Sequence, residues 1–389
     1  MKENKLIYLD HAATTPLDKE VFEKMTPYFC EQFGNADSPH AFGRKSMLAV
    51  DSARDSVASL LGAKPSEIYF TSGGTESDNW AILGGAYAKK REGRTRVLLS
   101  SIEHHAALSA GERLQKQGFQ VEYLPVNEGG RVALREVESR LGDDLALVCV
   151  MAANNETGVL QPVSEMAKTV RASGALFFTD CVQFAPYRKI DVKELGADML
   201  SFSAHKFFGP KGVGVLYIRD GVRIEKLVGG GEQERGLRGG TLNVPSVVGL
   251  AAAYEKTVRS LQETERKLSE LKTRFLQGIS VLDGVKINGD VENALPALLN
   301  LRVDGVENTA LLFNMDLKGV AIAAGSACAS ASVKPSHVLL AQGLSEEEAK
   351  SSVRISFGKD NTAEEIDRAL EIFVETVQKL RALNAVKNS

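Results

Sequence analysis

The chain has 389 residues, of which 43% are hydrophobic and 25% charged, and its formal net charge at pH 7 is −3. This length is sufficient for one large domain and a smaller one. The slightly acidic balance and the lack of a basic run argue against direct binding to nucleic acid, and no apolar stretch reaches the ~18 residues of a membrane span.

Short apolar segments alternate with amphipathic ones over the first two-thirds of the chain. Six of them are apolar throughout and end in polar residues or glycine, as expected of strands that are covered on both faces. They are residues 68–71, 96–101, 146–151, 175–180, 199–204 and 213–218. Amphipathic patterns between them, at 106–117 and 162–173, predict helices. This alternation predicts an α/β fold with a mostly parallel sheet between two layers of helices.

The pattern changes after about residue 250. The expected elements there are a long charged helix at 255–277, a strand at 351–358 and a closing helix from about Thr362 to Leu380, with an apolar stretch at 295–303 after the first helix. We therefore predict two domains. A large domain comprises residues 15–255, and a smaller α+β domain comprises residues 1–14 together with 256–389.

Residues typical of a cofactor site follow several predicted strands, at the edge where open α/β sheets bind ligands. After the first strand, Gly73 and Gly74 allow a tight turn, and Thr75 and Glu76 open a helix. Backbone N–H groups and the Thr75 hydroxyl would bind a phosphate there. The alternative is an ordinary turn with a capped helix.

Asp180 ends the strand at 175–180, and Gln183 follows it. A carboxylate there is either a helix cap or the counter-ion of a protonated pyridine nitrogen, which keeps such a ring an electron sink. Lys206 follows the strand at 199–204 between apolar neighbours. Desolvation favours a neutral, nucleophilic amine, so Lys206 suits Schiff-base chemistry, and the alternative is an exposed loop lysine.

Ser203 and His205 flank Lys206 and are further candidate phosphate ligands. His104 follows the strand at 96–101, where it would stack on a flat ring or move a proton, or have only a structural role. Taken singly, most of these features favour the structural alternative. The interpretation as a cofactor site therefore depends on their occurrence together, in strand order.

Seven motifs occur in order between Tyr8 and Arg354: YLDHAATTP, GGTESDN, EHHA, NNETG, SAHKFFGPKG, GGGEQERGLRGGT and GSACASAS. Together they resemble the class V aminotransferase group of pyridoxal-phosphate (PLP) enzymes, and most closely the cysteine desulfurases of the NifS/IscS type. The resemblance implies fold type I, with a mostly parallel seven-stranded sheet flanked by helices. It also implies pyridoxal 5'-phosphate as the cofactor and L-cysteine as the substrate, which is converted into L-alanine and a persulfide on Cys328.

The resemblance further implies a role for each residue near the cofactor ring. Lys206 would bind PLP covalently, Asp180 would pair with the pyridine nitrogen, and Gln183 would contact the ring hydroxyl. His104 would stack on the ring and move protons. Asn155, in NNETG, would lie near the ring and the substrate carboxylate.

The phosphate of the cofactor has its own implied ligands. Thr75, Ser203 and His205 would bind it, with Glu76 beside them in the same motif. Thr241 would reach the phosphate from the partner subunit of a homodimer. No metal is implied in this site.

Two further residues would act on the substrate. Arg354 would bind its carboxylate with both arms of the guanidinium group. Cys328 lies in AAGSACASASVKPS, where small residues bury little apolar surface, so we expect this segment to be mobile. A thiol there would take sulfur from cysteine and pass it on, whereas the alternative is a small buried cysteine.

The four cysteines, Cys30, Cys149, Cys181 and Cys328, are far apart and form no CxxC pair. Neither a disulfide framework nor a zinc site is expected, Cys149 is expected in the core, and Cys181 is interpreted as a bystander. A reducing cytoplasm fits this usage, and the N-terminal residues lack the pattern of a secretory signal.

The expected partner is a sulfur-acceptor protein, either an iron–sulfur scaffold, a tRNA-thiolating enzyme or a thiamine-pathway carrier. We expect no contact with a membrane. The alternatives to a desulfurase are a selenocysteine lyase, another class V PLP enzyme, or a catalytically silent binding protein.

Overall fold

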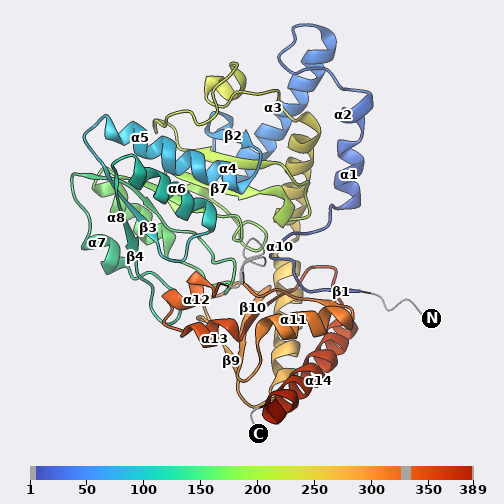
Figure 1. Cartoon of the computed structure of the whole chain (residues 1–389). Coiled ribbons are helices and arrows are strands. Elements are labelled where there is room, and N and C mark those ends of the chain that lie inside the picture. Colours follow the sequence, from blue (N-terminus) through green and yellow to red (C-terminus); the bar gives the residue numbers. More distant parts are fainter. Residues whose placement is uncertain (1–5, 326–333, 388–389) are drawn as a thin grey trace.

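The computed structural model describes residues 6–325 and 334–387. Its largest sheet occupies the upper half of Figure 1 and has seven strands. These are β2 (Ile68–Thr71), β3 (Arg96–Ser100), β4 (Gln120–Leu124), β5 (Leu145–Cys149), β6 (Leu176–Asp180), β7 (Met199–Ser203) and β8 (Gly214–Ile218). Their order is β2-β8-β7-β6-β5-β3-β4. β8 pairs antiparallel with both neighbours, and the remaining pairs are parallel, which confirms the predicted mostly parallel sheet.

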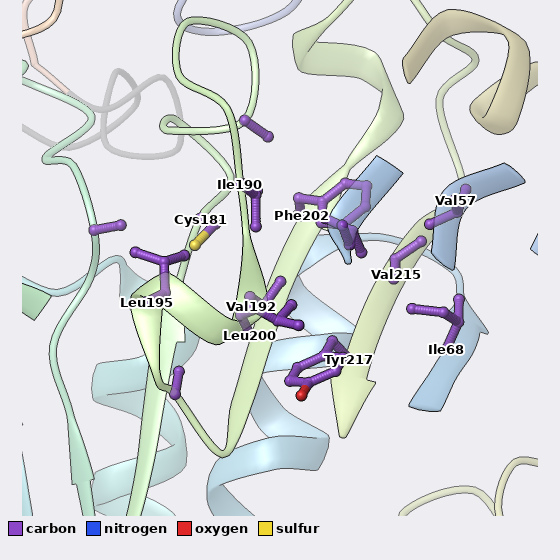
Figure 2. Packing of buried hydrophobic residues seen from close by; sticks show 14 of the residues in the cluster. Val57, Ile68, Cys181, Ile190, Val192, Leu195, Leu200, Phe202, Val215 and Tyr217 are labelled. Carbon is purple, nitrogen blue, oxygen red and sulfur yellow. The ribbon is translucent and has the colours of Figure 1, made fainter. Parts of the chain in front are cut away.

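Side chains of the central strands alternate between two hydrophobic cores, which explains why these strands are apolar at nearly every position. In β7, for example, Met199 belongs to one core and Leu200 to the other. Figure 2 shows the core to which Ile68, Val215 and Phe202 contribute from three neighbouring strands. The strand β4 was not predicted because its residues are mostly exposed and therefore lack the continuous apolar pattern, unlike those of the other edge strand, β2.

Helices cover both faces of this sheet. The helices of this part are α1 (Lys19–Met25), α2 (Pro27–Cys30), α3 (Ala41–Leu61), α4 (Gly74–Asn79), α5 (Gly85–Lys90), α6 (His105–Lys116), α7 (Leu134–Glu138), α8 (Val163–Ala172) and α9 (Val192–Leu195). The core in Figure 2 packs against α1, α3, α8 and α9. The opposite core packs against α5, α6 and the π-helical turn Trp80–Gly84.

A third core fills the lower half of Figure 1. Its sheet has the order β12-β10-β9 and is antiparallel. The strands and helices there are β9 (Val285–Ile287), β10 (Leu298–Val303), β11 (Val320–Ala321), β12 (Ser352–Ser356), α11 (Asn308–Leu317), α12 (His337–Ala341), α13 (Glu346–Lys350) and α14 (Ala363–Lys387). β1 (Ile7–Tyr8) pairs in parallel with β11, so the N-terminal segment joins this half.

One helix connects the two halves. α10 (Val244–Ile279) contributes Leu250 and Tyr254 to the core of the large sheet, and Leu268 and Phe275 to the third core (Figure 1). It begins earlier than predicted because its first part is buried and lacks the charged face on which the prediction relied. The predicted domain boundary at 255–256 falls inside this helix, and the domain limits remain a prediction. No described helix is apolar over a length that would cross a bilayer.

A buried ion pair fixes the segment 229–241 against the large sheet. Arg54 of α3 donates to Glu234 through Nη1 (2.9 Å) and Nη2 (2.6 Å), and the Phe70 N–H donates to the same carboxylate (2.9 Å). Glu234 and Arg235 adopt φ values of 47° and 60°, which are unfavourable for residues with a Cβ. The ion pair therefore offsets local backbone strain.

Replacing Arg54 by alanine should leave the buried carboxylate of Glu234 without its cation. We expect the free energy of unfolding to fall by about 3–5 kcal/mol, the cost of breaking a buried ion pair from one side. Urea unfolding measures this change. The control is Lys64→Ala, because the Lys64–Asp220 pair is exposed and its loss should leave stability nearly unchanged. Equal effects of the two substitutions would contradict the expectation.

Candidate active site

The predicted site residues meet at one edge of the large sheet. Asp180 ends β6, Lys206 follows β7, and Thr75, His104 and Asn155 follow β2, β3 and β5. Because these strands are parallel to one another, the ends that carry the five residues lie on the same side. The structure thus brings together residues that are up to 131 positions apart in the sequence, from Thr75 to Lys206.

Asp180 is a buried carboxylate in the middle of this edge. Its Oδ1 accepts a hydrogen bond from the Val182 N–H at 2.7 Å. Burial raises the pKa of Asp180, while that hydrogen bond and the positive charge of Lys206 lower it. The residue therefore caps the local turn and also offers a carboxylate oxygen to a cation, so the two interpretations of Asp180 are compatible.

The amine of Lys206 is half-buried and hydrogen-bonded. Lys206 ends a 3-10 turn, and its Nζ donates to the carbonyl oxygens of Ala12 (2.5 Å) and Ala13 (2.9 Å). Gln183 Nε2 donates to the same Ala12 oxygen at 2.8 Å. Lys206 is thus no exposed loop lysine, and the N-terminal segment crosses directly over the predicted site.

The glycine turn before α4 lies against the Lys206 turn. A Cβ at Gly73 would lie 3.6 Å from Ser203 Oγ, and one at Gly74 would clash with Val182 at 2.8 Å. Gly73 also has a φ of 147°, which favours glycine. The first N–H groups of a helix have no partner within it, so α4 offers donors at this place, next to Thr75.

Two residues of the predicted phosphate site have other partners in the structure. Glu76 accepts from Arg238 Nε (2.8 Å) and Nη2 (3.0 Å) and from the Ser72 N–H (2.8 Å). Its carboxylate thereby holds the segment 229–241, at whose end Thr241 is exposed. His205 Nδ1 lies 3.1 Å from Thr14 Oγ1. The ligand roles of Glu76, Thr241 and His205 remain predictions.

His104 is the N-cap of α6 and is mostly buried. Its Nδ1 accepts from the Ala106 N–H at 3.2 Å. Burial, and after it the charge of Lys206, lowers the pKa of His104 to about 4. The imidazole is therefore neutral at pH 7, with its proton on Nε2. His104 serves as a helix cap and at the same time presents an N–H donor.

Arg354 is almost fully buried in β12. Its Nη1 donates to the carbonyl oxygen of Asn155 (2.9 Å), and its Nη2 donates to Asp10 Oδ1 (2.8 Å). Its Nε is buried without a hydrogen-bond partner among the described residues. The guanidinium thus connects the smaller sheet with the turn after β5 and keeps one donor unused.

Two further buried carboxyl groups lie behind Asp180, and sequence analysis did not find them. Asp78 accepts from Ser201 Oγ at 2.6 Å, and Ser201 is the register neighbour of Asp180. Glu103 accepts from Ser100 Oγ (2.5 Å) and from the Met151 N–H (2.7 Å). Burial raises the pKa of Glu103 to about 8 and that of Asp78 well above its usual range. Asp78 lies within the motif GGTESDN and Glu103 within EHHA, but the sequence alone does not separate buried from exposed carboxylates.

Cys328 lies outside the described residues, but both flanks of its segment are described. Glu156 Oε2 accepts from Ser336 Oγ at 2.6 Å, and a Cβ added at Gly325 would lie 3.0 Å from the same oxygen. A cleft of about 510 Å³ adjoins these flanks. Its lining includes His105, Glu156, Phe313, Gly325, Lys334, Ser336 and His337. Glu156 therefore meets both flanks of the segment that carries Cys328.

Of the other cysteines, Cys149 lies in the core, as predicted. Cys149 and Cys181 are buried and Cys30 is exposed, all three as free thiols. Burial raises the pKa of Cys149 and of Cys181 well above the usual range, so both stay protonated. Within residues 6–325 and 334–387, no cluster of three or more His, Cys, Asp or Glu residues is arranged to hold a metal ion.

A sheet of this order, with a lysine and a buried carboxylate on adjacent strand ends, is characteristic of PLP enzymes of fold type I. The chain belongs to the class-V aminotransferase family, whose model matches residues 7–369. The protein named cysteine desulfurase IscS of Clostridium botulinum (strain Hall) is 45% identical, over 98% of this chain and 96% of its own.

Further relatives agree with this assignment. A putative cysteine desulfurase IscS 1 of Bacillus subtilis (strain 168) is 46% identical over 96% of this chain and 99% of its own. The solved structure of a NifS-like protein superposes with a TM-score of 0.90 at 37% identity, covering 96% of this chain and 99% of the other. The predicted family and fold are thereby confirmed.

The elevated pKa of Glu103 predicts a pH dependence of stability. The folded protein retains a proton between the ordinary pKa of 4.5 and about 8, which the unfolded chain releases. Stability contributed by this proton is present below pH 4.5 and is lost as pH rises towards 8. Glu103→Gln cannot ionise, so its stability relative to the parent protein should increase over this window. Urea unfolding at several pH values measures the difference.

The matched control for Glu103 is Glu112→Gln on α6, where the side chain is exposed. Its unfolding free energy should follow that of the parent protein at every pH. If Glu103→Gln also followed the parent protein in parallel, a protonated Glu103 in the folded state would be ruled out.

Proposed function

We propose that this chain is a PLP-dependent cysteine desulfurase, which removes sulfur from L-cysteine, forms L-alanine, and carries the sulfur as a persulfide on Cys328. One observation carries the proposal. Lys206 and Asp180 lie at the ends of adjacent strands, as an amine that binds an aldehyde and a carboxylate that faces its ring would need to lie. The 45% identical relative named a cysteine desulfurase supports the choice of substrate.

The residues at the sheet edge fit PLP. Lys206 offers a primary amine, whose Nζ donates to the carbonyl oxygens of Ala12 and Ala13. Asp180 offers a carboxylate oxygen for the pyridine nitrogen, and Gln183 lies close enough to share Ala12 with Lys206. When bound, PLP supplies an electron sink that stabilises negative charge at the substrate Cα.

The phosphate of PLP would lie at the glycine turn before α4. Thr75, Ser203 and His205 would hold it there, with donors from the first turn of α4. Glu76 would act at this place through Arg238 and the segment 229–241, and Thr241 would complete the site from the partner subunit. His104 would lie over the ring with its Nε2 proton available.

The substrate would be held by its carboxylate, and protons would move at named atoms. Arg354 would bind the carboxylate next to the carbonyl of Asn155. Lys206 Nζ would accept the Cα proton of cysteine. The Cys328 thiolate would then attack the substrate sulfur, forming an S–S bond while the Cβ–S bond breaks. The electron pair of that bond would stay on Cβ, which takes a proton, and Cα would take back a proton from Lys206 Nζ to give alanine.

A homodimer and a protein acceptor complete the proposal. Large apolar side chains on α1, α2, α3 and the adjoining loop are exposed, which is typical of a face that a second subunit covers. These are Phe22, Phe29, Phe33, Phe42 and Leu48. The acceptor would be an iron–sulfur scaffold or a tRNA-thiolating enzyme, in the cytoplasm.

The nucleophile can be tested by Cys328→Ser. We expect alanine and persulfide formation from cysteine to be lost, while the visible absorbance of bound PLP stays unchanged because Lys206 is intact. Lys206→Ala should lose that absorbance. Cys30→Ser is the matched control, since Cys30 is an exposed thiol, and it should keep full activity. Alanine formation by Cys328→Ser at the parental rate would show that another group attacks the sulfur.

The role of Asp180 can be tested by Asp180→Asn, which keeps the shape and removes the charge. We expect kcat for alanine formation to fall by about 10²- to 10³-fold, the size of losing one preorganised electrostatic group. Asp51→Asn on the exposed side of α3 should have no effect.

Parallel assays with selenocysteine distinguish a desulfurase from a lyase, because only the desulfurase requires Cys328.

A further inference from the structure

Asp10 is an acidic residue to which the proposed reaction assigns no role, yet it forms the ion pair of the predicted substrate-binding arginine. Its Oδ1 lies 2.8 Å from Arg354 Nη2. The side chain of Arg354 is 1% exposed and that of Asp10 is 19% exposed. The pair is therefore screened by little solvent, and the charge of Arg354 is largely balanced before any ligand arrives.

The backbone around Asp10 is fixed, so its carboxylate remains next to Arg354. Asp10 forms a bridge with Ser356, two residues beyond Arg354 on β12. The Ala12 N–H donates to Ser356 Oγ (2.9 Å), and the Ser356 N–H donates to the Leu9 carbonyl (2.8 Å). Hydrogen bonds on both sides of Asp10 thus hold its backbone against the strand that carries the arginine.

The guanidinium still has donors for a second carboxylate. Nη1 is used by Asn155 and one Nη2 hydrogen by Asp10, whereas Nε has no partner among the described residues. A carboxylate bound to Nε and the other Nη2 hydrogen would form the usual bidentate pair. Asp10 and a ligand carboxylate can therefore share one arginine without displacing each other.

Under the proposed function, the sharing of Arg354 between Asp10 and a ligand carboxylate affects the kinetics of the enzyme. L-Cysteine and L-alanine carry the same α-carboxylate, so an unbalanced buried Arg354 would hold substrate and product equally tightly. Such uniform binding lowers KM without raising kcat, and it slows the release of alanine. A second negative charge near the carboxylate weakens both complexes.

We propose that Asp10 is a positioning residue that orients the Arg354 guanidinium and weakens its hold on α-carboxylates, so that alanine leaves. This inference rests on the proposed function for its substrate and product. It assigns to Asp10 two separable effects. Its oxygen orients Arg354, and its charge limits the affinity of Arg354 for a ligand.

The test compares Asp10→Asn with Asp10→Ala in the PLP-loaded enzyme. Asparagine keeps an oxygen that accepts from Nη2 but removes the charge. We expect the KM for L-cysteine and the inhibition constant of L-alanine each to fall about tenfold, since one poorly screened charge is removed. The value of kcat should fall as product release slows. Asp10→Ala also loses the orienting oxygen, so its KM should exceed that of Asp10→Asn.

Two controls separate this role from a structural one. Asp360→Asn removes an exposed charge near His11 and should leave KM and the alanine inhibition constant at parental values. Cysteamine lacks the carboxylate, so its inhibition should be the same in Asp10→Asn and the parent enzyme. A damaged fold would instead weaken all ligands and lower the melting temperature.

The outcomes are distinct for the two proposals. If Asp10→Asn binds alanine as weakly as the parent enzyme, or more weakly, the role of Asp10 is wrong. If the parent enzyme forms no alanine from cysteine, the proposed function fails. Calorimetric titration of both proteins with L-alanine would then still measure the effect of Asp10 on carboxylate affinity.

Discussion

The crossing of residues 9–15 between the two halves of the molecule is the constraint on which the site depends. Leu9 accepts from the Ser356 N–H of the smaller sheet, and the Thr15 N–H donates to the His205 carbonyl of the large one (2.9 Å). Between these anchors, the carbonyl oxygens of Ala12 and Ala13 hold the amine of Lys206. The N-terminal segment therefore places the lysine and also carries the acid that pairs with Arg354. A shift of one half against the other would move both groups.

Charge at the sheet edge is balanced by keeping some acids neutral. Asp78, Glu103 and Asp180 are all buried within one region, and three carboxylates there would repel each other strongly. Burial raises the pKa of Glu103 to about 8 and that of Asp78 well above its usual range, which favours the protonated form of both. Burial also raises the pKa of Asp180, but only to about 6, because the Val182 N–H and the cation of Lys206 lower it. The arrangement thus selects Asp180 as the acid that ionises, and a bound pyridinium would stabilise that charge further.

The sequence predicted those parts of the molecule whose residues are determined by local pattern. Six of the seven strands of the large sheet were found because both of their faces are buried, and Lys206, Asp180 and His104 were found because they end or follow such strands. The half-exposed edge strand β4 carries no such pattern. The Asp10–Arg354 pair joins residues 344 positions apart, so only the fold reveals it. The same holds for Asp78, whose partner Ser201 lies 123 positions away.

The NNETG turn relates the thiol segment to the arginine. Asn154 Oδ1 accepts from the N–H groups of Glu156 (2.9 Å) and Thr157 (3.0 Å), which fixes the turn. Asn155 accepts from Arg354, and Glu156 meets both Ser336 and Gly325. Ala323, two residues before Gly325, also exchanges backbone hydrogen bonds with Arg354. Cys328 follows Gly325 by three residues in the sequence. The turn 154–157 therefore contacts both Arg354 and the residues that flank the Cys328 segment. A substrate carboxylate bound at Arg354 would thus have a fixed position relative to those flanking residues.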